Sequence, residues 1–154
     1  MTSEVIDGRR RDADAGTMTT TTLTHSPTSD ITHPLARPFL LVDAATTSGN
    51  GVGYLLAGAW LADWFGAPEP LVRGLGAFLL AFGVGVALLA ARRPIPRRAV
   101  LVLAGLNVLW VLASLGYAAF GGLTALGAGW AVVQALVVGA FAAGQLWLAR
   151  TTSA

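Results

Sequence analysis

Hydrophobic residues form four long segments between residue 39 and residue 149. The segments cover approximately residues 39–65, 71–90, 99–119 and 123–149. Each provides about the 20 residues that a helix needs to cross a ~30 Å hydrocarbon core at ~1.5 Å per residue. The breaks between them (GAPEP, RRPIPRR and GG) contain residues typical of turns. Because such short connections make neighbouring helices antiparallel, the pattern predicts an all-α, integral membrane four-helix antiparallel bundle over residues 38–150.

The segment before this region is polar and has no hydrophobic periodicity. It includes the run TMTTTTLTHSPTS, whose few apolar side chains bury too little surface to offset the entropy lost on ordering. The apolar core of a secretory signal peptide is also missing from the first thirty positions. Residues 1–37 are therefore predicted to be a disordered cytoplasmic tail.

The distribution of arginine predicts the orientation in the membrane. Nine of the ten arginines lie in the tail, in the loop 92–98 or after the fourth segment, and only Arg73 lies in either of the other two loops. Positively charged loops stay on the cytoplasmic side. We therefore expect a protein of the bacterial inner membrane with both termini in the cytoplasm.

Composition excludes several classes of function. The chain is 55% hydrophobic and only 12% charged, which differs from a typical soluble domain. It has no cysteine, and His25 and His33 both lie in the predicted tail, so the segments lack the usual metal ligands. The arginines flank apolar segments and do not form a stripe on a soluble face. We expect no enzyme activity, no cofactor, no metal site and no nucleic-acid partner.

The sequence GNGVG at residues 49–53 could indicate a phosphate-binding loop or a glycine-rich membrane helix. The dinucleotide-binding motif needs a third glycine where the chain has Leu56, and a P-loop needs a lysine, which the chain lacks. As a helix, the region places Asp43, Thr47, Asn50 and Tyr54 on one face, bordered by glycines. Such a polar stripe is typical of a membrane helix where it contacts other helices.

Asp43 is the residue of this stripe with two competing interpretations. It lies twenty residues before Asp63, or about 30 Å along a helix, so the two carboxylates are expected to bracket the membrane. A structural, interfacial salt bridge of Asp43 with Arg97, Arg98 or Arg150 is then the favoured role. The alternative is a functional carboxylate inside the membrane, where a charge is costly and marks proton or ion coupling.

The third and fourth segments carry polar residues that match the stripe. Asn107 shares a helical face with Trp110 and Ser114, and Gln134 shares one with Gln145. We predict that Asn50, Asn107 and Gln145, together with Asp43 and Thr47, belong to a polar cluster between the first, third and fourth segments. Ordinary helix packing is favoured over a functional site for this cluster.

The second segment has no polar centre. Gly74, Ala77, Ala81 and Gly85 recur at close to helical spacing, which predicts a face for packing against another helix. At the outer end of this segment, Arg73 is expected to pair with Asp63 or Glu69.

The loop RRPIPRR provides four candidates for contact with anionic lipid headgroups, namely Arg92, Arg93, Arg97 and Arg98. Each basic residue near such a surface contributes roughly 1 kcal/mol. The simpler interpretation is that the loop only determines topology.

The chain resembles the small, uncharacterised four-helix integral membrane proteins of high-GC Gram-positive bacteria. The features are a polar tail, an Asp near the start of the first segment, LAGLNVLW in the third and LTALG at the start of the fourth. The resemblance covers residues 38–149 and implies fold and location only. It implies no activity.

Three classes of function remain open. The favoured one is a non-enzymatic membrane protein that packs in the lipid bilayer and interacts with a membrane protein partner or with further copies of itself. The second is a small transporter or channel that uses the polar stripe, which requires a water-filled cavity reaching Asp43. An enzyme ranks last, because no residues in the segments have catalytic or metal-ligand spacing.

Overall fold

The computed structural model describes residues 30–151, which form five helices and one small antiparallel sheet. The elements are, in order, β1 (Asp30–Ile31), α1 (Ala36–Leu56), α2 (Gly58–Phe65), α3 (Glu69–Ala91), β2 (Ile95–Pro96), α4 (Arg97–Phe120) and α5 (Ala125–Thr151). The predicted second, third and fourth segments correspond to α3, α4 and α5 with ends that differ by one or two residues. The prediction of a mostly helical chain is therefore confirmed.

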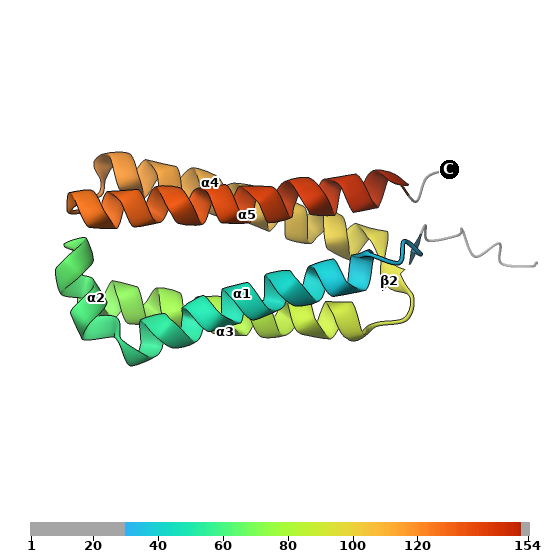
Figure 1. Ribbon diagram of the computed structural model, residues 1–154, viewed down its shortest axis with the longest axis horizontal. Coiled ribbons are helices and arrows are strands. Elements are labelled where there is room, and N and C mark those ends of the chain that lie inside the picture. The colour runs from blue at the N-terminus through green and yellow to red at the C-terminus, as the bar shows by residue number, and fades with distance from the viewer. Residues whose placement is uncertain (1–29, 152–154) are drawn as a thin grey trace, which may run out of the picture.

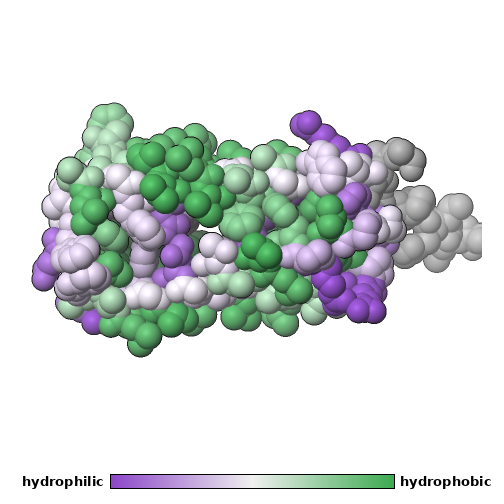
Figure 2. Space-filling view, viewed as in Figure 1, coloured by the Kyte–Doolittle hydropathy of each residue, from purple (hydrophilic) through white to green (hydrophobic). Residues whose placement is uncertain are grey.

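Three of the helices, α3, α4 and α5, are long and apolar enough to cross a membrane. Large hydrophobic side chains on these helices are exposed, for example Leu88 on α3, Leu109 on α4 and Leu136 on α5. In Figure 2, hydrophobic residues make up much of the visible surface, and strongly hydrophilic residues gather near the end that carries β1 and β2. α1 has 21 residues but also carries the polar stripe, and it is not among these three.

The long helices run in alternating directions and form two hairpins (Figure 1). α1 packs against α3, with the short α2 between them in sequence, and α4 packs against α5. Both ends of the described chain therefore lie at the same end of the molecule, beside the loop that joins α3 to α4 (Figure 1).

Glycines allow α1 and α3 to pack closely. A Cβ atom on Gly51 would lie 2.6 Å from the Leu80 backbone nitrogen, and one on Gly76 would lie 2.9 Å from the Gly51 carbonyl oxygen. The α3 glycines that face α1 are thus Gly76 and Gly83, which are buried. The predicted packing face of Gly74, Ala77, Ala81 and Gly85 is wrong, because all four are exposed. Both sets have helical spacing, and only the position of α1 distinguishes them.

The predicted first segment, residues 39–65, is not one helix but two, α1 and α2, separated at Ala57. Arg73 on α3 lies at the break: its Nη1 donates to the Leu55 carbonyl oxygen at 2.7 Å. A Cβ atom on Gly58 would lie 2.7 Å from Arg73 Cγ. The arginine therefore satisfies a carbonyl at the end of α1, and the glycine leaves room for its side chain.

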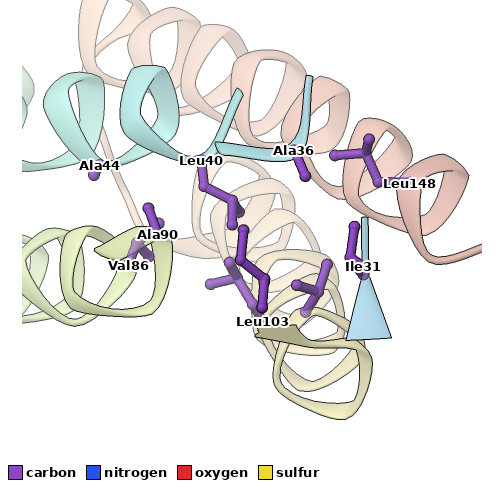
Figure 3. Packing of buried hydrophobic residues seen from close by; sticks show 10 residues of the cluster. Ile31, Ala36, Leu40, Ala44, Val86, Ala90, Leu103 and Leu148 are labelled. Carbon is purple, nitrogen blue, oxygen red and sulfur yellow. The ribbon is translucent and has the colours of Figure 1, made fainter. Parts of the chain in front are cut away.

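The two hairpins are joined at the end that carries the sheet. Asp30 and Ile31 pair with Pro96 and Ile95, respectively. Ile31 and Ile95 belong to a buried cluster with Leu40 from α1, Leu103 from α4 and Leu148 from α5 (Figure 3). The hydrophobic core at this end thus takes residues from both hairpins.

Part of the predicted disordered tail has a defined place in this core. Residues 1–29 lie outside the described residues, but residues 30–37 form β1 and the start of α1. The predicted boundary at residue 37 is therefore wrong. Ile31 is an isolated hydrophobic residue in a polar sequence, and its burial depends on Ile95, which is distant in sequence.

The hairpins also meet at the opposite end. Thr124, in the turn before α5, donates a hydrogen bond from Oγ1 to the Trp64 carbonyl oxygen at 2.6 Å. Its backbone nitrogen donates to the Phe65 carbonyl oxygen at 3.0 Å. Gly127 lies directly against the Phe65 backbone. The two hairpins are therefore joined by direct contacts at both ends.

Candidate functional site

A buried polar network links α1, α4 and α5 (hereafter the inner network). Gln145 donates from Nε2 to Asp43 Oδ2 at 2.7 Å and accepts from Asn107 Nδ2 at 3.1 Å. Thr47 donates to the other Asp43 oxygen, Oδ1, at 3.1 Å. Asp43 and Gln145 are 1% and 0% exposed, so the network lies in the interior. Each amide and carboxylate group thus has at least one polar partner, as buried polar groups require.

A second polar group (hereafter the outer network) lies further along α1 and α5. Asn50 donates to Gln134 Oε1 at 3.1 Å, and Trp130 donates to the Tyr54 hydroxyl at 2.6 Å. Gln134 Nε2 is 3.5 Å from the same hydroxyl, which is long for a hydrogen bond. The outer network therefore contains one weakly satisfied donor.

The helical periodicity of the sequence places these side chains. Asp43, Thr47, Asn50 and Tyr54 are spaced by four, three and four residues, so they follow one face of α1. Gln134 and Gln145 are eleven residues apart, about three turns of α5, and they reach the two networks separately. The stripe of α1 thus spans both networks.

Of the predicted cluster, the structure brings Asp43, Thr47, Asn107 and Gln145 together in the inner network and places Asn50 in the outer one. Gln134, Tyr54 and Trp130, which are not part of the predicted cluster, also take part. The spacing of Gln134 and Gln145 was the available signal for Gln134. No sequence signal pairs Trp130 with Tyr54.

The predicted interfacial salt bridge of Asp43 is wrong. Within residues 30–151 the ion pair is Arg73–Glu69, with 2.7 Å between Nε and Oε1, and no arginine pairs with Asp43. Arg97 donates instead to the Ala149 carbonyl oxygen at 2.7 Å. α1 begins at Ala36, so Asp43 is two turns, or about 10 Å, inside the helix. Its side chain points to α5 and is out of reach of the interfacial arginines.

The four candidate lipid-contact arginines differ in their surroundings. Arg92, Arg93 and Arg98 are exposed, whereas Arg97 is half-buried and bound to Ala149 at the end of α5. On the first hairpin, Arg37 donates to the Ala91 carbonyl oxygen at 3.2 Å. Arg37 and Arg97, like Arg73 at the opposite end of the molecule, thus bind carbonyl groups near helix C-termini, where the helix dipole favours a cation.

Two adjoining cavities lie between the hairpins (hereafter the cleft). Their volumes are about 240 Å³ and about 320 Å³, and residues of α1, α3, α4 and α5 line both. The walls are mostly apolar, but Thr47, Asn50 and Asn107 line the first cavity. Trp110, Ala113 and Gln134 line both, so these residues mark where the cavities meet. Asp43, which accepts a hydrogen bond from Thr47, does not itself line the cleft.

Trp110 has an unusual feature at this junction. Its indole Nε1 is buried and makes no hydrogen bond in the described structure. The Phe78 ring stacks on the indole at 5.7 Å with an interplanar angle of 9°. The ring is thus held in the cleft wall with an unsatisfied donor, which carries a cost of about 1–3 kcal/mol when nothing binds it.

The described residues 30–151 contain no group of three His, Cys, Asp or Glu side chains that could hold a metal ion. A scan against protein-family models, a search of curated proteins and a search of solved structures each found no match. The site must therefore be interpreted from its own geometry.

Proposed function

We propose that this chain is a non-enzymatic protein of the bacterial inner membrane that crosses the bilayer four times as an antiparallel bundle, with both termini in the cytoplasm. The observation that carries the proposal is the direction of the α1 polar stripe. Asp43 and Asn50 face α5, whereas Leu41, Val42, Val52 and Leu56 are exposed. α1 can therefore present an apolar surface to lipid although its average hydropathy is low.

The arginine positions support the cytoplasmic location of both ends. Arg37, Arg92, Arg93, Arg97, Arg98 and Arg150 all belong to segments at the end of the molecule that carries β1 and β2 (Figure 1). Arg73 lies toward the opposite end and is paired with Glu69. The positive-inside rule assigns the arginine-rich end to the cytoplasm.

The lack of cysteine allows this topology to be tested directly, because each introduced cysteine is the only one. We expect a membrane-impermeant maleimide to label Ala67→Cys and Ala125→Cys in intact cells. Thr32→Cys and Thr151→Cys should react only after the cells are opened. Labelling of Thr32→Cys and Ala67→Cys from the same side would show that α1 does not cross, and a fully reversed pattern would overturn the orientation.

The inner network favours a packing role over chemistry. Both carboxylate oxygens of Asp43 accept hydrogen bonds from neutral side chains, and neither lies on the cleft wall. Polar groups that satisfy one another between membrane helices fix which helices meet. In this proposal the network holds α1 against the second hairpin, and a membrane protein partner or a further copy of the chain binds from the bilayer.

The second candidate is a small transporter or channel. The cleft favours it, because Thr47 and Asn50 of the stripe and Asn107 of α4 line a cavity. The position of Asp43 opposes it, since the carboxylate does not reach that cavity. Proteoliposomes with an internal pH dye would test it: proton flux that Asp43→Asn abolishes would establish the transporter, and flux equal to that of empty vesicles would exclude proton transport.

A further inference from the structure

The cleft has the properties of a small-molecule site. Its cavities of about 240 Å³ and about 320 Å³ lie near the lower end of the volumes of such sites, ~300–1,000 Å³. The walls are largely apolar with a few polar groups, which is the usual composition of a ligand pocket. This inference goes beyond a packing role, which needs no cleft.

The cleft can be reached from the side of the molecule. Phe78 on α3 and Leu109 on α4 both line the first cavity, and they are also 51% and 62% exposed. The cavity therefore opens between α3 and α4, at a position where the surrounding residues are hydrophobic. In a membrane this opening faces the acyl chains, so the molecules that enter are lipid-soluble.

Two hydrogen-bond donors among the residues that line the cleft lack a good acceptor. Trp110 Nε1–H has no partner, and Gln134 Nε2 has only the 3.5 Å contact with the Tyr54 hydroxyl. The Gln134 oxygen already accepts from Asn50. Trp110 lines both cavities but its Nε1 is buried, so the indole must turn to present its N–H to a ligand. A ligand that supplies an acceptor would then satisfy donors that the protein leaves unsatisfied, and in an apolar setting such a bond is not in competition with water.

We propose that the cleft binds a lipid-soluble molecule with a carbonyl group on an apolar chain. Trp110 donates a hydrogen bond to the carbonyl oxygen, and the chain lies against the apolar walls of the two cavities. The carbonyl is that of a free ketone-type or quinone-type compound, or the ester carbonyl of a membrane lipid.

The test uses the full-length protein in nanodiscs of a diether phospholipid, which has no ester carbonyl. The ¹H–¹⁵N resonance of the Trp110 indole is assigned with Trp110→Phe and followed during addition of 2-undecanone or of undecane. We expect 2-undecanone to move this resonance downfield in a saturable manner, and undecane to leave it in place. If undecane moved the Trp110 resonance as much as 2-undecanone does, the proposal would be overturned. The same holds if 2-undecanone moved the resonance in neither the diether nor the diester lipid.

Diester phospholipid nanodiscs distinguish the two sources of the carbonyl. If the lipid ester is the ligand, the downfield shift is already present in diester nanodiscs without added ketone and disappears in the diether lipid. If a free carbonyl compound is the ligand, the two lipids give the same starting spectrum. Either starting spectrum supports the site, provided that 2-undecanone moves the Trp110 resonance in the diether lipid.

Two variants separate the hydrogen bond from the space. Trp110→Phe keeps an aromatic ring against Phe78 and removes the donor together with the five-membered ring that carries it, so 2-undecanone should bind about three- to tenfold more weakly although the cleft becomes slightly larger. Ala113→Leu fills the junction of the cavities and should weaken binding more than tenfold. The exposed Trp147→Phe is the matched control and should bind as the unaltered protein does. Unchanged binding by Trp110→Phe would overturn the assigned donor.

Discussion

Gln145 on α5 donates a hydrogen bond to Asp43 on α1 across the two hairpins, with 2.7 Å between Nε2 and Oδ2. Both side chains are buried. Gln145 also accepts from Asn107, so one glutamine connects three helices. This contact fixes the rotation of α1, the most polar of the long helices, about its axis, because turning this face away from α5 would take Asp43 out of the protein interior.

The first prediction is that Asp43 and Gln145 are energetically coupled. Gln145→Leu removes the partner of Asp43 Oδ2 and the acceptor of Asn107, at about 1–3 kcal/mol per group, and leaves Asp43 only the hydrogen bond from Thr47; Asp43→Leu similarly leaves Gln145 without its acceptor. The double variant should be less destabilised than the sum of the two single ones, by about 0.5–3 kcal/mol. Unfolding in detergent micelles, followed by tryptophan fluorescence, measures this.

Asp43→Asn is the matched control for that cycle. The asparagine oxygen can still accept from Gln145 or Thr47, so the loss of stability should be smaller than for Asp43→Leu. Strict additivity of Asp43→Leu and Gln145→Leu would show that the contact does not contribute to stability.

Helical periodicity was sufficient to predict much of this arrangement. The stripe on α1, the face of Asn107 and the spacing of Gln134 and Gln145 follow from 100° per residue, and they placed the polar residues between the correct helices. The partner of Asp43 could not be predicted in this way. The sequence pattern offers several polar side chains as possible partners of Asp43. Whether Gln145 or an arginine becomes the partner depends on the residue at which α1 begins and on the position of α5 along the axis of α1.

Other features depend on contacts that are distant in sequence. The break at Ala57 lies where Arg73 of α3 reaches the Leu55 carbonyl, eighteen residues away. The ordering of Ile31 depends on Ile95. A single sequence identifies Arg73 and Ile31 as unusual in their surroundings, but it does not identify the residues that they contact.

The second prediction concerns the glycines of α1. Gly51→Ala would place a Cβ atom 2.6 Å from the Leu80 backbone nitrogen, so α1 and α3 must move apart, at about 1–3 kcal/mol. Gly49→Ala meets nothing within 4 Å and should be neutral or stabilising by up to about 1 kcal/mol, because alanine favours the helix. The midpoints of unfolding of Gly51→Ala and Gly49→Ala, each compared with that of the unaltered protein, test this. Equal effects at the two positions would contradict the α1–α3 packing.

The third prediction tests the ordered start of the described chain. Ile31→Ala removes a side chain that is 5% exposed from the core cluster, which should cost about 2–4 kcal/mol locally. The amides of residues 31 and 95 should then exchange with solvent faster, as hydrogen exchange with mass spectrometry would show. Thr32→Ala, at an exposed neighbouring position, should leave exchange unchanged. Fast exchange at residue 31 in the unaltered protein would contradict the β1–β2 pairing.

The last prediction separates the arginines of the loop 92–98 by role. Arg92 and Arg93 are exposed, so their replacement by alanine should weaken retention of anionic phospholipid, measured by native mass spectrometry, by about fivefold per residue. Arg97→Ala should lower stability instead, because its guanidinium binds the Ala149 carbonyl at the end of α5. Arg73→Ala, at the opposite end and paired with Glu69, is the control and should retain anionic lipid normally. If Arg73→Ala reduced retention as much as Arg92→Ala, the effect would come from net charge alone, and the loop would act only as a determinant of topology.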